Sequence, residues 1–292
     1  MFKGSIVAIV TPFKDGKVDE AGYRELIEFH IENGTDAIVP CGTTGESATL
    51  SMEKEHTRVI DIAVDAVNKR LPVIAGAGAN STSEAIALTA HAKKAGADAT
   101  LQVTPYYNKP TQEGLYQHFK AIADAVPLPQ VLYNVPSRTS INMVPETVAR
   151  LAELPEVVAI KEASGDLAQM AEIYRLAGDN ITLLSGDDNM TLPLLAIGGK
   201  GVISVVANIV PKETADMVKA WEMGDVDRAR ALFYRLLPLC QAMFYETNPI
   251  PVKTSLAMMG KISEEMRLPM APMSPANRER LKRALEDYGL LS

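Results

Sequence analysis

The feature that most constrains the fold is a repeat of short apolar runs rich in β-branched residues. The runs cover residues 5–10, 37–40, 72–75, 99–103, 130–133, 157–161, 181–184 and 201–205. Amphipathic stretches typical of helices lie between them, among them residues 20–33, 53–69, 83–95 and 145–154. Eight strand-helix units in about 220 residues predict an α/β chain folded as a (β/α)8 TIM barrel. A doubly wound sheet is disfavoured because Ile9-Val10-Thr11-Pro12-Phe13, after the first run, lacks a glycine fingerprint.

The strand pattern stops near Lys212, and the rest of the chain reads as helices. We expect them over residues 212–222, 226–245, 251–259 and 275–288. The pattern therefore predicts a catalytic barrel domain over residues 1–224 and a C-terminal helical domain over 225–292. No low-complexity linker separates the two, so this helical appendage is expected to pack on the barrel.

The composition of the chain limits which binding partners and which cellular compartment are expected. The formal net charge of −7 disfavours binding to nucleic acid or to an anionic membrane surface. No apolar run reaches the roughly 18 residues of a membrane span, and the first residues do not resemble a signal peptide. Cys41 and Cys240 are far apart in sequence, which is typical of free thiols in a reduced compartment. We expect a cytoplasmic protein with no nucleic-acid or membrane partner.

Polar residues follow five of the eight predicted strands. In a barrel the carboxyl ends of the strands face one mouth, so chemistry is expected among these segments. They are residues 41–46, 104–108, 133–138, 161–162 and 185–188.

Lys161 is the sharpest single observation. The two-residue strand period places Val157, Ala159 and Lys161 on one face. If that face points inward, desolvation favours the neutral amine that a nucleophile requires. The alternative is a lysine that reaches from the strand end to solvent, and the strand alone does not decide between them.

Residues of neighbouring segments could complete a site around this amine. Tyr133 ends the adjacent strand, where a phenol could carry protons for an imine or simply cap the core. Thr43 and Thr44 could hold a carboxylate, although a Gly-Thr-Thr-Gly sequence also suits an ordinary turn. Arg138 could grip a second carboxylate or remain solvated. Cys41 is expected to be structural, because the lysine already supplies a nucleophile.

Taken together, these motifs resemble the dihydrodipicolinate synthase family of the N-acetylneuraminate lyase superfamily, nearly end to end. The resemblance rests on residues 42–47 (GTTGES), 104–110 (TPYYNKP), 133–139 (YNVPSRT), 160–163 (IKEA), 185–188 (SGDD) and 248–253 (NPIPVK). It implies a metal-free lyase without a cofactor that condenses pyruvate with L-aspartate 4-semialdehyde on the way to diaminopimelate and lysine.

The resemblance also implies roles for individual residues. Lys161, Tyr133, Thr43 and Tyr107 would be catalytic, and Thr44, Arg138, Ile203 and Gly186 would bind substrate. Pyruvate would form the imine on Lys161, while Tyr133 would move protons through Thr43 and Tyr107. In this family the second tyrosine of the pair enters the neighbouring subunit's site, which implies a dimer paired again into a homotetramer. Adjacent strand-end residues point to opposite sides, so Tyr106 and Tyr107 are not expected to serve one pocket.

An inhibitory lysine site is a further implication of the resemblance. It would involve Ala48, His56, Asn80, Glu84 and Tyr106. Two departures from the family pattern bear on these regions. Ser140 stands where a glycine is expected, and the segment 50–56 is one residue longer than usual.

Other functions fit part of the pattern. A sialic acid lyase, or an aldolase for a sugar-derived keto acid, would keep Lys161 and Tyr133 but need groups for a polyol. A silent barrel that binds a small acid would not need the full lysine, tyrosine and threonine set. Gly198-Gly199-Lys200-Gly201 resembles a phosphate loop, but it precedes the eighth strand and should lie at the opposite end of the barrel. The four histidines lack metal-ligand spacing.

Overall fold

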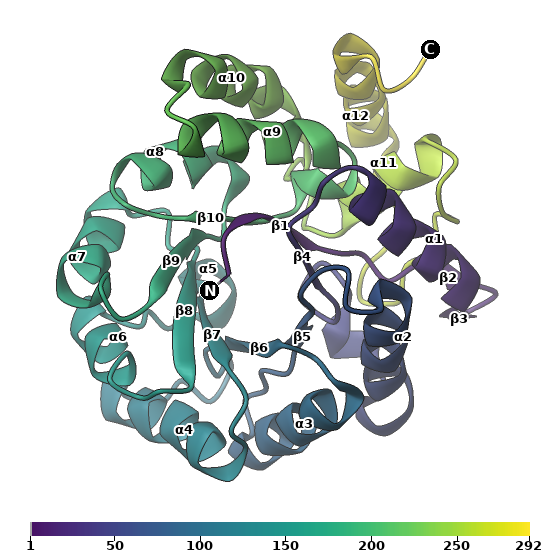
Figure 1. Ribbon diagram of the computed structural model, residues 1–292. Coiled ribbons are helices and arrows are strands. Elements are labelled where there is room, and N and C mark those ends of the chain that lie inside the picture. Colours follow the sequence, from purple (N-terminus) through teal and green to yellow (C-terminus); the bar gives the residue numbers. More distant parts are fainter. Residues whose placement is uncertain (1) are drawn as a thin grey trace.

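Parallel strands form a closed barrel in the computed structural model, which describes residues 2–292 (Figure 1). The sheet order is β4-β1-β10-β9-β8-β7-β6-β5, and a bridge between Ile38 and Val73 joins β4 to β5. The predicted (β/α)8 barrel is confirmed. The strands are β1 Gly4–Ala8, β4 Ala37–Val39, β5 Ile74–Gly76, β6 Ala99–Val103, β7 Gln130–Asn134, β8 Val157–Glu162, β9 Thr182–Ser185 and β10 Gly201–Ser204.

Helices surround this ring (Figure 1). The barrel helices are α1 Glu20–Glu32, α2 Thr57–Val67, α3 Thr82–Ala95, α4 Gln112–Ala125, α5 Pro136–Thr139, α6 Pro145–Leu151, α7 Leu167–Ala177, α8 Thr191–Ala196 and α9 Pro211–Glu222. The later helices are α10 Val226–Ala242, α11 Ile250–Met258 and α12 Pro275–Tyr288. Short 3₁₀ turns are η1 Ser47–Thr49, η3 Asp188–Met190 and η4 Val206–Asn208.

The hydrophobic core of the barrel has two layers, one inside the ring of strands and one between the strands and the helices. Inward side chains from the strands, such as Ile6, Leu101 and Leu184, form one cluster inside the ring. Outward side chains pack against the surrounding helices in two further clusters. Strands buried on both faces explain the nearly continuous apolar runs in the sequence.

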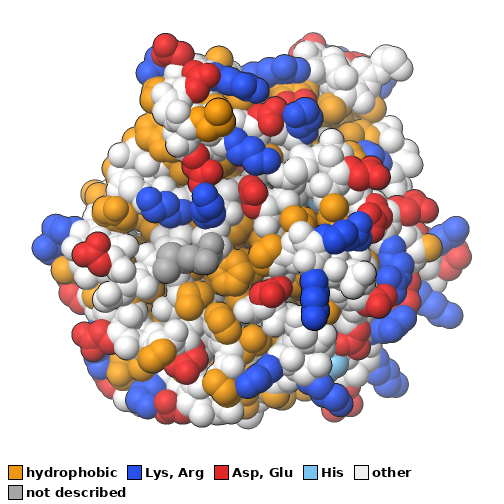
Figure 2. Space-filling view, viewed as in Figure 1, with side chains coloured by type: hydrophobic (Ala, Val, Ile, Leu, Met, Phe, Trp, Pro, Cys, Tyr) orange, Lys and Arg blue, Asp and Glu red, His pale blue; other side chains and the backbone are white. Residues whose placement is uncertain are grey.

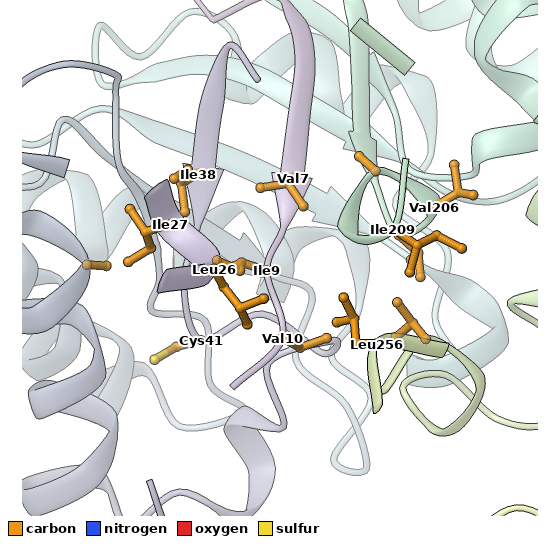
Figure 3. Close-up of a cluster of buried hydrophobic side chains, with 14 of the residues drawn as sticks. Val7, Ile9, Val10, Leu26, Ile27, Ile38, Cys41, Val206, Ile209 and Leu256 are labelled. Atoms are coloured by element: carbon orange, nitrogen blue, oxygen red, sulfur yellow. The ribbon is translucent and has the colours of Figure 1, made fainter. Parts of the chain in front are cut away.

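The appendage shares the outer core of the barrel. Leu236, Leu256 and Leu281 of α10, α11 and α12 are buried in the same cluster as Val7 of β1. Figure 3 shows Leu256 beside barrel residues of this cluster. The division of the chain at residue 224 stays a prediction, and the shared cluster is what joins the two parts.

Local structure departs from the sequence pattern in three places. Val131 pairs with Ala159 whereas Gln130 pairs with Val157, so one residue bulges and Val157 turns to the outer layer. The prediction that Val157 shares the face of Ala159 and Lys161 is therefore wrong for Val157. The helix expected from residue 53 begins instead with a π-helical turn, η2 Met52–His56. A small hairpin of β2 (Phe13–Lys14) and β3 (Lys17–Val18) was not anticipated.

Figure 2 shows basic and acidic side chains interleaved on the face seen in Figure 1, with hydrophobic side chains gathered near its centre. Among residues 2–292, the structure contains no helix both long and apolar enough to cross a membrane.

Candidate active site

Lys161 and Tyr133 lie side by side at the mouth of the barrel. They are directly paired across β8 and β7, and both belong to the inward face. The Lys161 Nζ lies 4.2 Å from the centre of the Tyr133 ring. Lys161 is only 5% exposed, so the alternative of a solvated strand-end lysine is wrong. An amine beside a phenol can form an imine with the phenol as proton donor and acceptor.

A cavity of about 60 Å³ contains both groups. Most of the residues predicted from the sequence surround it. Its lining includes Thr43, Thr44, Tyr133, Arg138, Lys161 and Gly186, together with Ser137, Asp187, Phe244 and Asn248. Two predicted residues do not line it. Ile203 lies in β10 within the barrel core, and Tyr107 lies outside the cavity.

The turn after β4 presents Thr43 and Thr44 to this cavity. Gly45 N–H donates to the Gly42 carbonyl at 3.0 Å, and Glu46 N–H donates to the Thr43 carbonyl at 3.1 Å. Thr44 is buried, and its Oγ1 accepts a hydrogen bond from Asn248 Nδ2 at 3.0 Å. The segment is thus a hydrogen-bonded turn whose two threonines line the cavity.

Arg138 and Gly186 both line the cavity. Arg138 is exposed on α5, and its Nη2 donates to the Asn248 carbonyl at 3.1 Å. A Cβ at Gly186 would stand 2.6 Å from Ala163 Cβ and 3.2 Å from Lys161 Cε. Gly186 therefore leaves the space in which the lysine side chain lies. Ser140, which replaces an expected glycine, adopts a left-handed φ of 57° at the end of α5.

Two acidic residues follow β9 beside the lysine. Burial raises the pKa of Asp187, against the opposing effect of the Lys161 ammonium. Asp188 is buried and accepts from Val205 and Val206 N–H at 3.0 and 2.9 Å, so it supports the loop after β10. Asp187 thus places a titratable carboxyl in the cavity, whereas Asp188 is structural.

A second, larger pocket of about 400 Å³ adjoins the cavity, because Thr43, Arg138 and Asn248 line both. Four of the five predicted lysine-site residues line this pocket. They are Ala48, His56, Glu84 and Tyr106. Asn80 lies next to it and donates through Nδ2 to the Tyr106 carbonyl at 3.2 Å. The residues predicted for the lysine site therefore lie together, in or beside the larger pocket.

Tyr106 and Tyr107 diverge as predicted, but for a different reason. β6 ends at Val103, so neither tyrosine is in a strand. Tyr107 has a φ of 68°, which breaks the path of the chain between the two rings. Tyr106 is 40% exposed and lines the larger pocket, whereas Tyr107 is 90% exposed and lines neither space. Within one chain, Tyr107 does not reach Lys161.

Cys41 is buried below the threonine turn. Its Sγ contacts the His56 carbonyl at 3.5 Å, and burial raises the pKa of the thiol. Burial lowers the pKa of His56, whose Nε2 lies 2.7 Å from the Gly76 carbonyl. The contacts of His56 with Cys41 and Gly76 hold η2 against the barrel. Because its thiol is buried and its pKa is raised, Cys41 is unsuited to act as a nucleophile.

Two other predictions concern sites elsewhere. Across residues 2–292 no group of three or more His, Cys, Asp or Glu side chains is arranged to hold a metal ion. The glycine-rich run ends where β10 begins, and the Lys200 carbonyl accepts from Gly4 N–H at 2.9 Å. It lies at the amino ends of the strands, away from the mouth, as expected.

Comparisons with known proteins decide among the related families. The model of the dihydrodipicolinate synthetase family matches residues 1–288. This chain belongs to that family. A 4-hydroxy-tetrahydrodipicolinate synthase from Thermodesulfovibrio yellowstonii is 64% identical, with the whole of both chains covered.

Solved structures agree with this assignment to the dihydrodipicolinate synthetase family. One is the chloride-inhibited dihydrodipicolinate synthase from Acinetobacter baumannii in complex with pyruvate, with 50% identity, a TM-score of 0.97 and full coverage of both chains. Another is the enzyme from Cyanidioschyzon merolae with lysine bound, with 45% identity, a TM-score of 0.96 and 99% of each chain covered.

Sequence reasoning within this family missed some of the lining. Asn248 was noted only as part of a motif, and Asp187 only as part of the polar segment 185–188, with no role of its own. Phe244 carried no signal, and Ser137 was noted only within the segment 133–138. The positions of both depend on how the appendage and α5 meet the mouth. The strand-end position pointed to the segment 185–188, but it did not distinguish Asp187, which lines the cavity, from Asp188, which does not.

Proposed function

We propose that this chain condenses pyruvate with L-aspartate 4-semialdehyde through an imine on Lys161. The activity is that of the 4-hydroxy-tetrahydrodipicolinate synthases, lyases of diaminopimelate and lysine biosynthesis. The observation that carries the assignment to Lys161 is its buried amine, 4.2 Å from the Tyr133 ring centre inside the cavity. A biosynthetic lyase with two buried free thiols fits the cytoplasm.

Imine formation uses the two strand-end residues. The neutral Lys161 amine adds to the keto carbon of pyruvate, and the carbinolamine loses water to give the imine. Tyr133 delivers the proton that leaves with the water and later takes one from the pyruvate methyl group. The resulting enamine forms the carbon–carbon bond to the aldehyde. Attack of the amino group of the second substrate on the imine carbon then closes the ring and releases Lys161.

Two groups hold the carboxylates in this proposal. The turn carrying Thr43 and Thr44 offers a hydroxyl and backbone N–H groups to pyruvate. Arg138, exposed at the mouth, offers a forked donor to the carboxylate of the aldehyde substrate. Gly186 keeps room for the chain of the bound imine. The role of the Ile203 backbone rests on the resemblance, because Ile203 does not line the cavity.

The direct test is to add pyruvate with borohydride and locate the modified residue by peptide mass. Reduction should add mass irreversibly at Lys161 and nowhere else, and Lys161→Ala should lose nearly all turnover while remaining folded. Modification at another lysine, or none, contradicts the imine at Lys161. A long polyol aldehyde consumed faster than aspartate semialdehyde would favour a sugar-acid aldolase instead.

The proposed assembly is a homotetramer made of two tight dimers. Its motivation is Tyr107, which is 90% exposed in one chain and lines neither the cavity nor the larger pocket. In a two-fold dimer each subunit could supply Tyr107 to its partner's site. Tyr107→Phe keeps the ring and removes the hydroxyl, so a proton-relay role predicts a fall in kcat of about 100-fold or more with the dimer intact.

A mixing experiment tests the shared site more strictly. A heterodimer of Tyr107→Phe and Lys161→Ala subunits has one site with a good lysine and a good borrowed phenol. Such mixtures should regain activity that neither parent has. If mass measurement confirms subunit exchange and no activity returns, Tyr107 does not act across the interface.

The larger pocket is proposed as the inhibitory lysine site. Glu84 offers a carboxylate to an ammonium, and Tyr106 supplies an aromatic wall. Burial and the nearby Glu84 raise the pKa of Tyr106, so its phenol stays protonated as a hydrogen-bond donor. Lysine should lower the activity of the parent protein and have little effect on Glu84→Ala, measured over a range of lysine concentrations.

A further inference from the structure

A buried ion pair joins the threonine turn to the helical appendage. Lys253 Nζ of α11 lies 2.5 Å from Glu46 Oε1, and the two side chains are 0% and 2% exposed. Burial lowers the pKa of Lys253, against the opposing effect of Glu46. The Lys253 ammonium also lies 4.2 Å from the centre of the Phe13 ring. The only charged partner of this lysine among the ion pairs of the described residues is therefore the glutamate that ends the turn.

The second oxygen of Glu46 is held by the appendage as well. Arg267 N–H donates to Glu46 Oε2 at 3.1 Å. The Arg267 guanidinium donates to the Thr49 carbonyl at 3.1 Å and is fixed in turn by both oxygens of Glu55. Lys253 and Arg267 thus both hold the segment from Glu46 to Thr49, although they lie 207 and 221 residues after Glu46 in the sequence.

Glu46 needs this support because of its backbone. Its φ is 53°, a left-handed conformation that a residue with a Cβ adopts only when its surroundings hold it there. Two residues earlier, Thr44 is also tied to the appendage region through Asn248 Nδ2. The turn that presents the hydroxyls to the cavity is therefore shaped at both ends by residues beyond the barrel repeat.

We propose that the Glu46–Lys253 pair, with Arg267, is a positioning device for keto-acid binding. It fixes the turn that carries Thr43 and Thr44, and so makes the appendage part of the substrate site. The inference rests on the proposed function, since it assumes that this turn binds pyruvate. The competing interpretation is that the pair only fastens the appendage, but buried ion pairs stabilise folds poorly compared with apolar contacts of the same size.

The decisive variant is the double replacement Glu46→Leu with Lys253→Met. Each single replacement leaves an unpaired buried charge and is expected to unfold more easily than the parent. The double variant removes both charges and keeps similar volume, so its unfolding midpoint should recover toward that of the parent. The double variant should nevertheless still lack the contacts that hold the turn at Glu46.

The readout is the pyruvate concentration that gives half-maximal borohydride trapping at Lys161. We expect it to rise about ten- to a hundredfold in the double variant, because small displacements of binding groups have effects of that size. Leu281→Ala is the matched control. Leu281 is buried in α12 within the same core, so the change loosens the appendage without touching the turn. Its half-saturating concentration should stay at the parent value.

Hydrogen exchange of amides 42–46 adds a measurement that does not depend on catalysis. Exchange should be faster in the double variant than in Leu281→Ala. Parent-like trapping together with parent-like exchange in a folded double variant overturns the inference. A parent protein that traps no pyruvate overturns the proposed function instead, and the exchange data then still decide whether the pair positions the turn.

Discussion

Replacing Gly186 by alanine should impair the active site through a single methyl group. The φ of Gly186 lies outside the left-handed region, so space alone decides the effect. The new Cβ would stand 2.6 Å from Ala163 Cβ, 3.1 Å from the Glu162 carbonyl and 3.2 Å from Lys161 Cε. Ordinary carbon–carbon contacts lie at about 3.5–4.0 Å, so the worst overlap is about 1 Å.

The structure has to move β8 or the loop after β9 to relieve this overlap. Overpacking of this kind typically costs about 1–3 kcal/mol of unfolding free energy. Ala163 is two residues after Lys161 in the same segment, so relief of the clash shifts Lys161, the proposed nucleophile, as well. A misplacement of about 1 Å lowers rates by as much as about 100-fold. We expect kcat/KM to fall by about 10- to 100-fold.

The assay combines steady-state kinetics, the rate of borohydride trapping at fixed pyruvate, and urea unfolding. Ala163→Gly with Gly186→Ala is the informative combination, because it removes the atom at 2.6 Å and leaves the contacts above 3.0 Å. The double variant should recover stability and part of the trapping rate, relative to Ala163→Gly alone as its reference. Unchanged kinetics in Gly186→Ala, or no recovery in the double variant, would refute the steric account.

Three further outcomes follow from burial and charge. Cys41→Ser should keep most of the activity, since burial raises the pKa of the thiol; a loss comparable to that of Lys161→Ala would contradict this. Burial lowers the pKa of His118 to about 4, so its ring stays neutral in the folded chain while the unfolded chain gains a proton below about pH 6.5. Its contribution to stability is therefore present above about pH 6.5 and lost as the pH falls through about 4, by up to about 3 kcal/mol. Urea titrations at about pH 7 and pH 4.5 measure this loss of unfolding free energy, which should be smaller in His118→Gln than in the parent. An equal loss in both would show that His118 does not contribute to the acid sensitivity. Lysine inhibition that survives Glu84→Ala would place the inhibitor outside the larger pocket.

Periodicity predicted that Tyr133 and Lys161, the proposed catalytic pair, lie side by side, because register in a parallel sheet is local. Tyr133 and Lys161 each end an inward-facing column on adjacent strands, so their proximity follows from strand order and a two-residue period. The same rule failed at Val157, where a bulge shifts the pairing by one residue. A bulge depends on how two strands meet, and the composition of one strand does not reveal it.

The remaining contacts of the site join residues far apart in the sequence, so a local sequence pattern does not predict them. Asn248 reaches Thr44 across 204 residues, and Lys253 reaches Glu46 across 207. A lone lysine among Ile250, Pro251 and Val252 was the only local sign that α11 buries a charge. A lysine that is buried with no water to solvate it requires a carboxylate partner, and the strand-end turns were the place to look for one.

The appendage thus contributes residues to the barrel mouth as well as covering the outer core of the barrel. Asn248 contacts both groups proposed to hold the two substrates' carboxylates, Thr44 through its side chain and Arg138 through its carbonyl. A shift of the segment between α10 and α11 would therefore alter both carboxylate sites together. The larger pocket is lined by Pro249, Pro269 and Met270 of the same region, so a ligand bound there contacts the elements that position the substrates. Any ligand that favours one arrangement of these residues would change substrate affinity without reaching Lys161.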